Sequence, residues 1–526
     1  MSESGTDALG TPRPTALNPQ SSFLIAAFIS VLLGAALCAS GKYREAAASS
    51  AALLCLAFIL SARLSVESIL ITWFATTPLA YFYIRFPVDK SIITYDRAVF
   101  ALVAVMILVG LRRAGGPRSG AALPGAWPPL HGEEAGQRAI RSGRAAPPFT
   151  GVSVSRFEVA WALLSVLALA SAAVKSGDVA YATRIAVDSF FLPLAAFHVA
   201  RHHFDVRGRA GSLMIGAIML ALFLFITGAF EFASGANLFQ YKGSELVRER
   251  ELRVNGPFAS DTSYTIICLL VAVFLRAAPA MLRVRLDRLA RLLYALAQGA
   301  AVIATLLSLF RATAIALVIC WLILRRLESR GSAARGERDA HAHWPMSRGP
   351  LLIVTIAIAA GIIMLGPSSI GRRITDPRNA FGRLATWEAA AVIAVENPLF
   401  GVGLTNYHDY FHAKYNWEDE SVESVLHARA ADSPHSNLLW IAAELGLVAL
   451  ALYLMANVYL FFMGVRAMWK ADGSQRRAAA ACYLTLVAAY FIPGLTLASG
   501  YYSDLNLYFF FMLGLLLNES LAAAPT

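Results

Sequence analysis

Three basic side chains far apart in the sequence have the chemistry needed for group transfer from a diphosphate. Arg253 opens a turn-forming segment, 253–258, and Arg311 interrupts an apolar stretch. Two guanidinium groups facing one cleft can grip a diphosphate by bidentate hydrogen bonds and stabilise the charge that grows on it as it leaves. A neutral His435 beside them can take the proton from an acceptor hydroxyl. Because arginines supply the positive charge, we expect this site to need no metal ion.

The residues around His435 suggest how the imidazole is held. Ser433 suits a helix N-cap and Pro434 suits the first helical position, which predicts His435 in the first turn of a helix. The positive end of the helix dipole disfavours a charged imidazole there, as a general base requires. Three other histidines precede it in the same loop, so residue type alone does not select His435.

Acidic residues near the same span ends are candidates for supporting roles. Asp188, Glu231 and Asp261 can each orient an arginine or the histidine. They can equally pair with arginines for structure alone. Glu444 lies nine residues after His435, which is about 13 Å deeper along a helix. We therefore expect Glu444 to brace helix packing.

Each basic residue also has a purely structural interpretation. Arg253 can anchor at lipid headgroups, and Arg311 can extend its guanidinium outward from a hairpin. A histidine at a helix start can simply satisfy a hydrogen bond. An arginine with so few polar neighbours is nevertheless energetically costly in a membrane and tends to mark a functional site.

The elements that must position these residues are membrane spans. The chain has 526 residues, of which 57% are hydrophobic and 15% charged, whereas soluble domains are about 45–50% apolar and about 25% charged. Fourteen apolar runs approach the roughly 20 residues that a span needs. We therefore predict an all-α integral membrane protein, a polytopic bundle of 12–14 transmembrane helices. The runs are 22–40, 46–62, 66–84, 98–111, 157–174, 184–200, 212–234, 259–276, 292–309, 312–325, 350–366, 437–464, 478–495 and 505–518.

Orientation follows from the basic residues in short loops. With the N-terminus inside, the inner segments hold 27 of the 45 Lys and Arg, so the formal charge of +11 indicates topology and not nucleic-acid binding. Both termini are then cytoplasmic and the candidate site is extracytoplasmic. The predicted regions are a disordered tail (1–21), N-terminal spans (22–111), a disordered cytoplasmic linker (112–156), central spans (157–366), a large, partly helical periplasmic loop (367–434) between the spans near 350–366 and 437–464, C-terminal spans (435–518) and a tail (519–526).

No cofactor or metal motif stands out. The five cysteines all lie in apolar runs, and none has CxxC spacing. Neither a disulfide framework nor a zinc site is indicated. The acidic run 418–420 is best explained as a solvated loop.

Several segments resemble the superfamily of O-antigen ligases and O-antigen polymerases. Residues 435–446 are similar to its signature of a histidine, apolar residues and Glu-x-Gly after the large loop. Segments 382–387 and 397–407 look like its Arg-x-x-x-Trp and Pro-x-x-Gly-x-Gly blocks. The segment 253–258 and Arg311 resemble its two arginine motifs, and all four features occur in the family's order.

The resemblance implies an inverting transfer from an undecaprenyl-diphosphate glycan on the periplasmic face of the bacterial inner membrane. It implies His435 as the catalytic base and Arg253 and Arg311 on the diphosphate, with Arg383 and Asn437 as supporting motif residues. Ser436 departs from the family, because many members have asparagine there. The implied partners are the lipid-linked glycan, the membrane and an acceptor, with no cofactor.

The sequence does not decide whether the acceptor is lipid A core, another lipid-linked repeat or a protein hydroxyl. It therefore does not distinguish a ligase from a polymerase. A transporter or flippase of lipid-linked glycans or solutes is the main alternative. It predicts broken helices in the middle of the membrane and internal repeats, whereas the polar groups here lie at span ends. A scaffold of a polysaccharide export complex would not need His435.

Overall fold

The computed structural model describes the helical body of the chain. The described residues are 65–83, 85–86, 93–115, 154–235, 239, 254–258, 260–282, 284, 287–308, 310–333, 378–414, 434–471, 474–497, 499–518 and 521. The predicted tail 1–21 and the predicted spans 22–40, 46–62 and 350–366 lie outside them, as do 116–153 of the predicted linker and 415–433 of the predicted loop.

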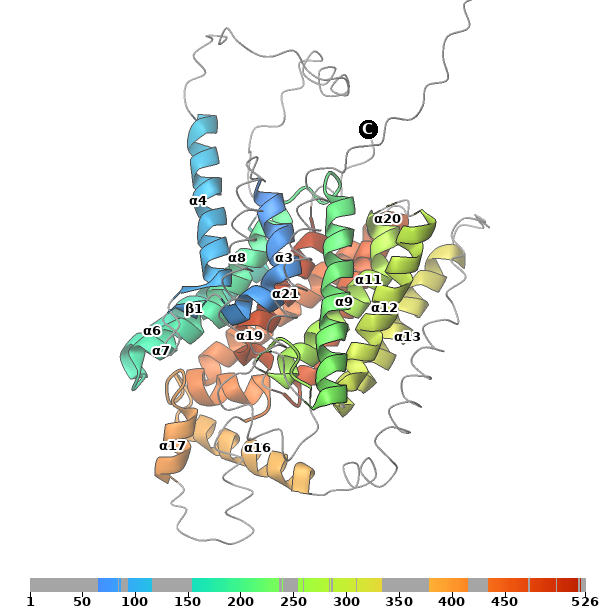
Figure 1. The fold of residues 1–526 in the computed structure, drawn as a ribbon. Coiled ribbons are helices and arrows are strands. Elements are labelled where there is room, and N and C mark those ends of the chain that lie inside the picture. Colours follow the sequence, from blue (N-terminus) through green and yellow to red (C-terminus); the bar gives the residue numbers. More distant parts are fainter. Residues whose placement is uncertain are drawn as a thin grey trace, which may run out of the picture.

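Helices make up almost all of the regular structure (Figure 1). In chain order the elements are α3 (Val66–Tyr83), strands β1 (Arg85–Phe86) and β2 (Ile93–Thr94), α4 (Tyr95–Gly115), α6 (Arg156–Lys175), α7 (Val179–Ala186), the π-helix η1 (Val187–Phe191), α8 (Leu192–His202), α9 (Ala210–Ser234), α11 (Asp261–Leu282), α12 (Arg288–Leu307), α13 (Arg311–Ala333), α16 (Arg378–Glu396), α17 (Tyr407–Lys414), α19 (Asn437–Trp469), α20 (Ser474–Gly494), the 3-10 turn η3 (Ser499–Tyr501) and α21 (Ser503–Leu516).

The prediction of an all-α polytopic membrane protein is confirmed. Within the described residues, seven helical stretches are long and apolar enough to cross a membrane, and two shorter apolar helices lie at 66–80 and 503–516. One antiparallel pair of two-residue strands, β1 and β2, joins α3 to α4. The predicted spans at 212–234 and 157–174 correspond to α9 and α6 within two residues at each end.

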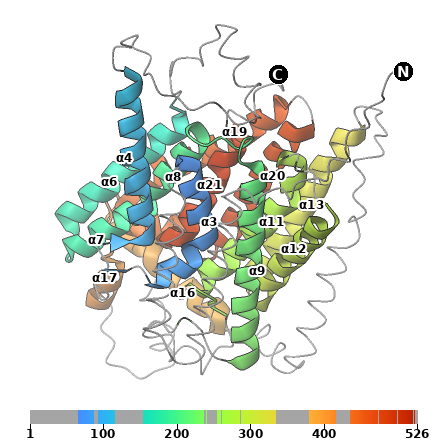
Figure 2. The same cartoon turned by 45° about the horizontal axis from the view of Figure 1, so that its top comes forward.

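Successive long helices run up and down the bundle, so their connections gather at two ends (Figures 1 and 2). We name these ends by a residue at each. The His435 end contains the last residues of α9, α12 and α20 and the first residues of α11, α13, α19 and α21. The Glu158 end contains the first residues of α6, α9, α12 and α20 and the last residues of α8, α11 and α19. Helices α16 and α17 lie at the His435 end, outside the bundle.

The centre of the bundle is formed by α11, α20 and α21, and α11 is the most deeply buried of the candidate spans. Aromatic rings fill the contacts between helices. Phe157 stacks on Phe510, and the rings of Tyr490 and Phe509 stack with their centroids 4.1 Å apart. Since lipid tails are as apolar as these side chains, close packing and not exclusion from water holds membrane helices together.

Buried tyrosines add hydrogen bonds between helices. Tyr264 donates to the Leu224 carbonyl, Tyr294 to Leu275, and Tyr508 to Phe74. Each hydroxyl bonds a carbonyl of a neighbouring helix at 2.7–3.0 Å. A hydroxyl buried without such a bond would be costly, so these contacts fix which helices are neighbours.

Candidate functional site

His435 lies directly before helix α19. The structure corrects the predicted cap, because the N-cap is Ser436 and the helix begins at Asn437. His435 therefore does not occupy the first helical turn. Its backbone is left-handed, with φ at 46°, a conformation that non-glycine residues seldom adopt and that tends to persist at functional sites. Two residues after this turn, Asn437 is bound to the rest of the bundle.

Asn437 fastens the start of α19 to the connection between α20 and α21. Its amide donates to the Ser499 hydroxyl at 2.8 Å and accepts from the backbone N–H of Gly500 at 2.7 Å. Trp440, one turn later, packs edge-on against Tyr501. The predicted supporting role of Asn437 is thus a positioning one, and it brings the His435 segment beside η3.

A polar cavity of about 100 Å³ lies next to this junction. Most of its lining residues carry a hydroxyl or a charged group: Arg184, Ile185, Asp188, Ser260, Ser263, Tyr501, Tyr502, Ser503 and Asp504. Burial raises the pKa of the Tyr501 and Tyr502 hydroxyls. Both therefore stay protonated at neutral pH and can donate hydrogen bonds. The cavity combines donors and acceptors in the way that the hydroxyl groups of a sugar require.

Asp188 is held by an arginine that the sequence analysis did not consider. Arg97 donates to both carboxylate oxygens, at 2.8 and 2.6 Å. Arg184, one turn earlier, approaches Asp188 at 3.7 Å, and its buried Nε has no hydrogen-bond partner among the described residues. Asp188 lies in the π-helix η1, an irregularity frequent at functional sites. Asp188 thus pairs with Arg97 and Arg184, and Arg184 is an additional basic group that lines the cavity.

Glu231 positions the turn that follows Arg253. Its carboxylate accepts from the backbone N–H groups of Asn255 and Gly256, at 3.1 and 2.7 Å. Gly256 has φ at +55°, and a Cβ there would lie 2.5 Å from the Tyr264 ring, so only glycine fits. Arg253 itself lies outside the described residues, but the turn beside it is fixed by a buried carboxylate.

The remaining predicted residues lie at the same end of the bundle. Arg311 is the first residue of α13 and its side chain is exposed. Asp261 is the first residue of α11, and the Ser260 hydroxyl caps that helix by accepting from the N–H of Thr262. Arg383 belongs to α16, and its side chain lies outside the described part of the structure. Asp261, Arg311 and the backbone of Arg383 therefore lie at the same end of the bundle as His435. Direct contacts among His435, Arg253 and Arg311 remain a prediction.

The Pro-x-x-Gly-x-Gly and Glu-x-Gly segments meet in space. Helix α19 is broken at Gly446, where φ is 82° and ψ is 179°. The break frees the carbonyls of Ala443 and Glu444, which accept from the N–H groups of Val402 and Gly403, both at 2.9 Å. A Cβ on Gly446 would lie 2.4 Å from the Leu399 carbonyl oxygen. These two segments form one interlocked structure at the His435 end.

Glu444 completes this interlock. Its buried carboxylate accepts from the N–H of Thr405 at 2.8 Å, from the N–H of Tyr407 at 3.4 Å and from the Trp440 indole at 2.8 Å. Thr405 is left-handed, with φ at 71°, which is strained for a β-branched residue. This geometry agrees with the bracing role predicted for Glu444.

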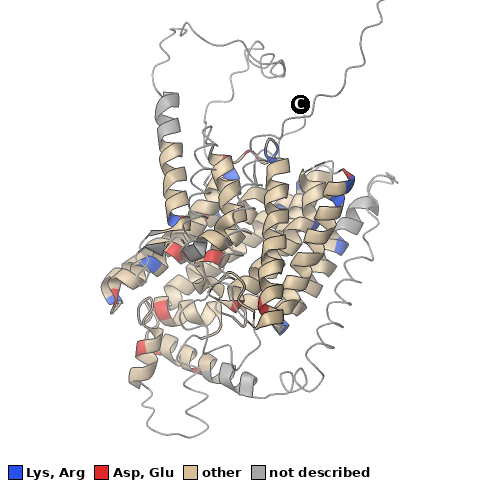
Figure 3. Ribbon diagram, viewed as in Figure 1, with Lys and Arg blue, Asp and Glu red and all other residues tan. Residues whose placement is uncertain are grey.

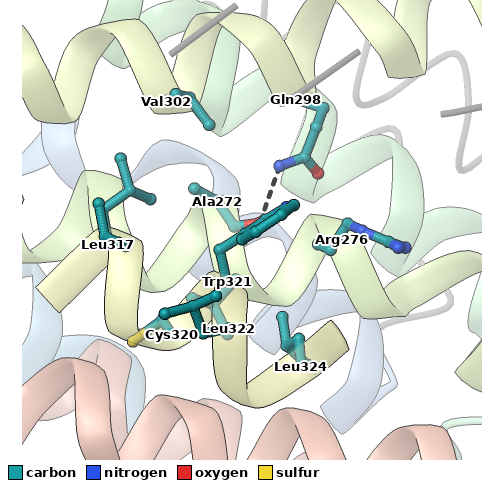
Figure 4. A pocket seen from close by; sticks show the side chains of 11 residues that line it. Ala272, Arg276, Gln298, Val302, Leu317, Cys320, Trp321, Leu322 and Leu324 are labelled. Carbon is teal, nitrogen blue, oxygen red and sulfur yellow. Dashed lines mark hydrogen bonds between the residues drawn. The ribbon is translucent and has the colours of Figure 1, made fainter. Parts of the chain in front are cut away.

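A second cavity, of about 110 Å³, lies between α11, α12 and α13. Figure 4 shows it lined mainly by apolar side chains, with Gln298 bonded to the Ala272 carbonyl. None of the predicted site residues lines it. It offers few of the polar groups that glycan or diphosphate recognition needs.

Sequence reasoning missed Arg97, Arg184, Tyr501 and Tyr502. Arg184 and Asp188 are spaced i, i+4, a signal that predicts an ion pair on one helix face. Arg97 is 91 residues from Asp188, and no local pattern connects them. The tyrosines follow a glycine in a short connection between spans, where nothing but their position suggests a cavity.

Comparison with known proteins finds a family that matches the middle of the chain. Residues 265–454 match the model of a protein family described as O-antigen ligase, Wzy_C. Among curated proteins, no match is found. The matched segment runs from α11 into the second half of α19, so it includes Arg311, His435 and the interlock at Gly446. Residues 265–454 of this chain are therefore similar to the O-antigen ligase family.

Proposed function

We propose that the chain is an inverting glycosyltransferase that moves a glycan from an undecaprenyl-diphosphate donor to an acceptor hydroxyl. The reaction takes place at the His435 end, on the periplasmic face of a bacterial inner membrane. The observation that carries the proposal is the left-handed His435 at the start of α19, where Asn437 and Trp440 contact the segment 499–501 that borders the polar cavity. The family match supports the same class of reaction.

The charges around the cavity indicate that the sugar and the diphosphate of the donor bind at two different places. Arg97 and Arg184 are balanced by Asp188 and Asp504, so the cavity adds no net positive charge. Its hydroxyls and carboxylates therefore suit the sugar. The diphosphate needs further cations, which Arg253 and Arg311 supply. Because guanidinium groups neutralise the leaving diphosphate, no metal ion is required.

The proton transfer falls to His435. Its neutral imidazole takes the proton of the acceptor hydroxyl as the oxygen attacks the anomeric carbon and the bond to the diphosphate breaks. The acceptor enters on the face opposite the leaving group, which inverts the configuration. The products are a new glycosidic bond and a lipid diphosphate, and the histidine proton returns to solvent.

The distribution of charge supports the proposed orientation. In Figure 3, Asp and Glu gather in the half of the bundle nearer α16 and α17, while Lys and Arg gather toward the opposite end. Basic residues favour the cytoplasmic side. The His435 end is then periplasmic, where lipid-linked glycans are presented.

The test is transfer by the purified chain in nanodiscs, supplied with a lipid-diphosphate glycan. A nanodisc has no second compartment, so transport alone yields no new glycan product. We expect transfer by the natural chain, its loss in His435→Ala, and normal transfer by the control His412→Ala on α17. Product on lipid A core defines a ligase, and longer lipid-linked chains define a polymerase. Full activity of His435→Ala would refute the proposed base.

A further inference from the structure

The Glu158 end holds a second cluster of titratable groups, far from the proposed transfer site. Glu158 of α6 faces two histidines of α8. Its Oε1 atom lies 2.8 Å from His198 Nδ1 and 3.9 Å from His202 Nε2. All three potential ligand atoms lie within 4.8 Å of one another. Helix α6 has 20 residues, so about 30 Å separates this cluster from the far end of that helix.

The carboxylate is oriented so that one oxygen faces the imidazoles. The other oxygen, Oε2, accepts from the N–H and the hydroxyl of Ser155, both at 2.7 Å, and from Arg201 at 2.9 Å. Ser155 and Glu158 form a capping box at the start of α6. Hydrogen bonds that orient a ligating carboxylate are typical of metal sites.

The two histidines are held rigidly as well. They are one helical turn apart, so both project from the same face of α8. The Asn518 amide donates to the carbonyls of Ala200, Arg201 and Phe204, at 2.7–3.0 Å, and fixes the end of this helix. A Cβ on Gly514 would lie 2.4 Å from the Phe197 carbonyl oxygen, so this glycine allows α21 to approach α8 closely.

We propose that Glu158, His198 and His202 form a binding site for a divalent transition-metal ion, with zinc as the ion of choice. Two imidazoles and one carboxylate are typical zinc ligands at about 2.0–2.2 Å. A tetrahedral ion places such ligand atoms about 3.4 Å apart, so small side-chain rotations bring this set onto one ion. The His198 side chain is 34% exposed, which leaves room for water as the fourth ligand.

Both imidazoles bind the ion in their neutral form. The Nδ1 atom of His198, which faces Glu158 Oε1 at 2.8 Å, binds with the ring proton on Nε2. Arg201 remains on Oε2. The His203 ring lies beside that of His198, with the ring centroids 5.8 Å apart, and is not one of the proposed ligands.

The ion would tie α6 to α8 and would take no part in transfer, because it sits at the opposite end of the bundle from His435. The site therefore stands independently of the proposed glycosyltransferase activity. The residue types could be found in the sequence as two histidines spaced i, i+4. Their carboxylate partner is 40 residues from His198 and could not.

The experiment measures metal binding by the full chain, purified without a polyhistidine tag and stripped with a chelator. Zinc is titrated in competition with a chromophoric chelator, and Co²⁺ provides an absorption spectrum that reports nitrogen and oxygen ligands. The variants are Glu158→Gln and His202→Ala. The matched controls are His203→Ala, beside the cluster, and His408→Ala with His412→Ala, an exposed histidine pair on α17.

We expect one equivalent of zinc in the natural chain and a rise in Tm when it binds. Affinity should fall at least tenfold in Glu158→Gln and His202→Ala, and stay unchanged in both controls. If a variant does not fold, the Co²⁺ spectrum of the natural chain still tests for two nitrogen ligands. The proposal is overturned if the natural chain binds no zinc, if the spectrum lacks nitrogen ligands, or if binding is lost only in the α17 control.

Discussion

The two ends of the bundle use the same side-chain types on different backbones. At the Glu158 end, histidines and an arginine surround a carboxylate on regular, capped helices. At the His435 end, the backbone is irregular at several places, among them the π-helix η1, the break at Gly446 and the left-handed His435. Within a membrane, irregular backbone is tolerated where protein satisfies its polar groups or where it lines a cavity.

The two carboxylates differ in their surroundings. Glu158 bonds Ser155, Arg201 and His198, whereas Asp188 lines a cavity together with Arg184, whose Nε has no hydrogen-bond partner within the described part of the chain. Changes at the His435 end should therefore affect transfer, whereas changes at the Glu158 end should leave transfer per folded molecule unchanged.

The largest effect is expected for Gly446→Ala. The new Cβ would lie 2.4 Å from the Leu399 carbonyl oxygen, and the backbone there has φ at +82°, which disfavours any side chain. The segment 397–406 can then no longer dock on α19, and transfer should fall about 100-fold or more, as misplaced catalytic groups do. Transfer rate and Tm are measured together. Gly211→Ala on α9 is the control, because its Cβ would meet nothing within 4 Å; equal behaviour of the two variants would contradict the interlock.

Asp188→Asn should destabilise the chain by about 3–5 kcal/mol, because the bidentate pair with Arg97 is mostly buried and breaking it leaves a charge uncompensated. The measurement is the free energy of unfolding in mixed micelles. Asp178→Asn makes the same chemical change at the N-cap of α7, where asparagine caps equally well. A loss at Asp188 no larger than at Asp178 would show that the pair is not structural.

Asn518→Ala tests the Glu158 end. It removes one amide that serves three carbonyls, and we expect a loss of about 1–3 kcal/mol in stability. Transfer per folded molecule should stay normal. Asn457→Ala is the control, since that amide donates to the Tyr453 carbonyl four residues earlier in its own helix. Reduced transfer by a folded Asn518→Ala protein would contradict the expectation that the Glu158 end takes no part in transfer.

The smallest effect is expected for Tyr501→Phe. Tyr501 lines the cavity, and the variant keeps the edge-on contact of the ring with Trp440 but loses the hydroxyl and its hydrogen bond with the Tyr181 hydroxyl at 3.2 Å. One neutral hydrogen bond is worth about 1 kcal/mol, so KM for the glycan substrate should rise by up to about tenfold with little change in Tm. Tyr410→Phe, whose hydroxyl bonds Glu396 outside the cavity, should leave KM unchanged.

The sequence predicts the spans well because apolar length is a local property. The run 212–234 and the helix Ala210–Ser234 differ by two residues at one end. It also predicts which end carries Arg311 and His435. The cap at Ser436 could not be predicted, because Asn437 is bound to Ser499 and Gly500, more than sixty residues later. The docking of 397–406 at Gly446 depends on backbone contacts that leave no periodic pattern.

If donor and base meet at the His435 end, a bound donor must be found there. We propose cryo-electron microscopy of the chain in nanodiscs with a non-transferable lipid-diphosphate sugar. We expect the diphosphate within about 4 Å of the Arg311 guanidinium, an ion-pair distance, with the sugar in the cavity lined by Tyr501. A diphosphate in the apolar cavity between α11 and α13, or at the Glu158 end, would contradict it.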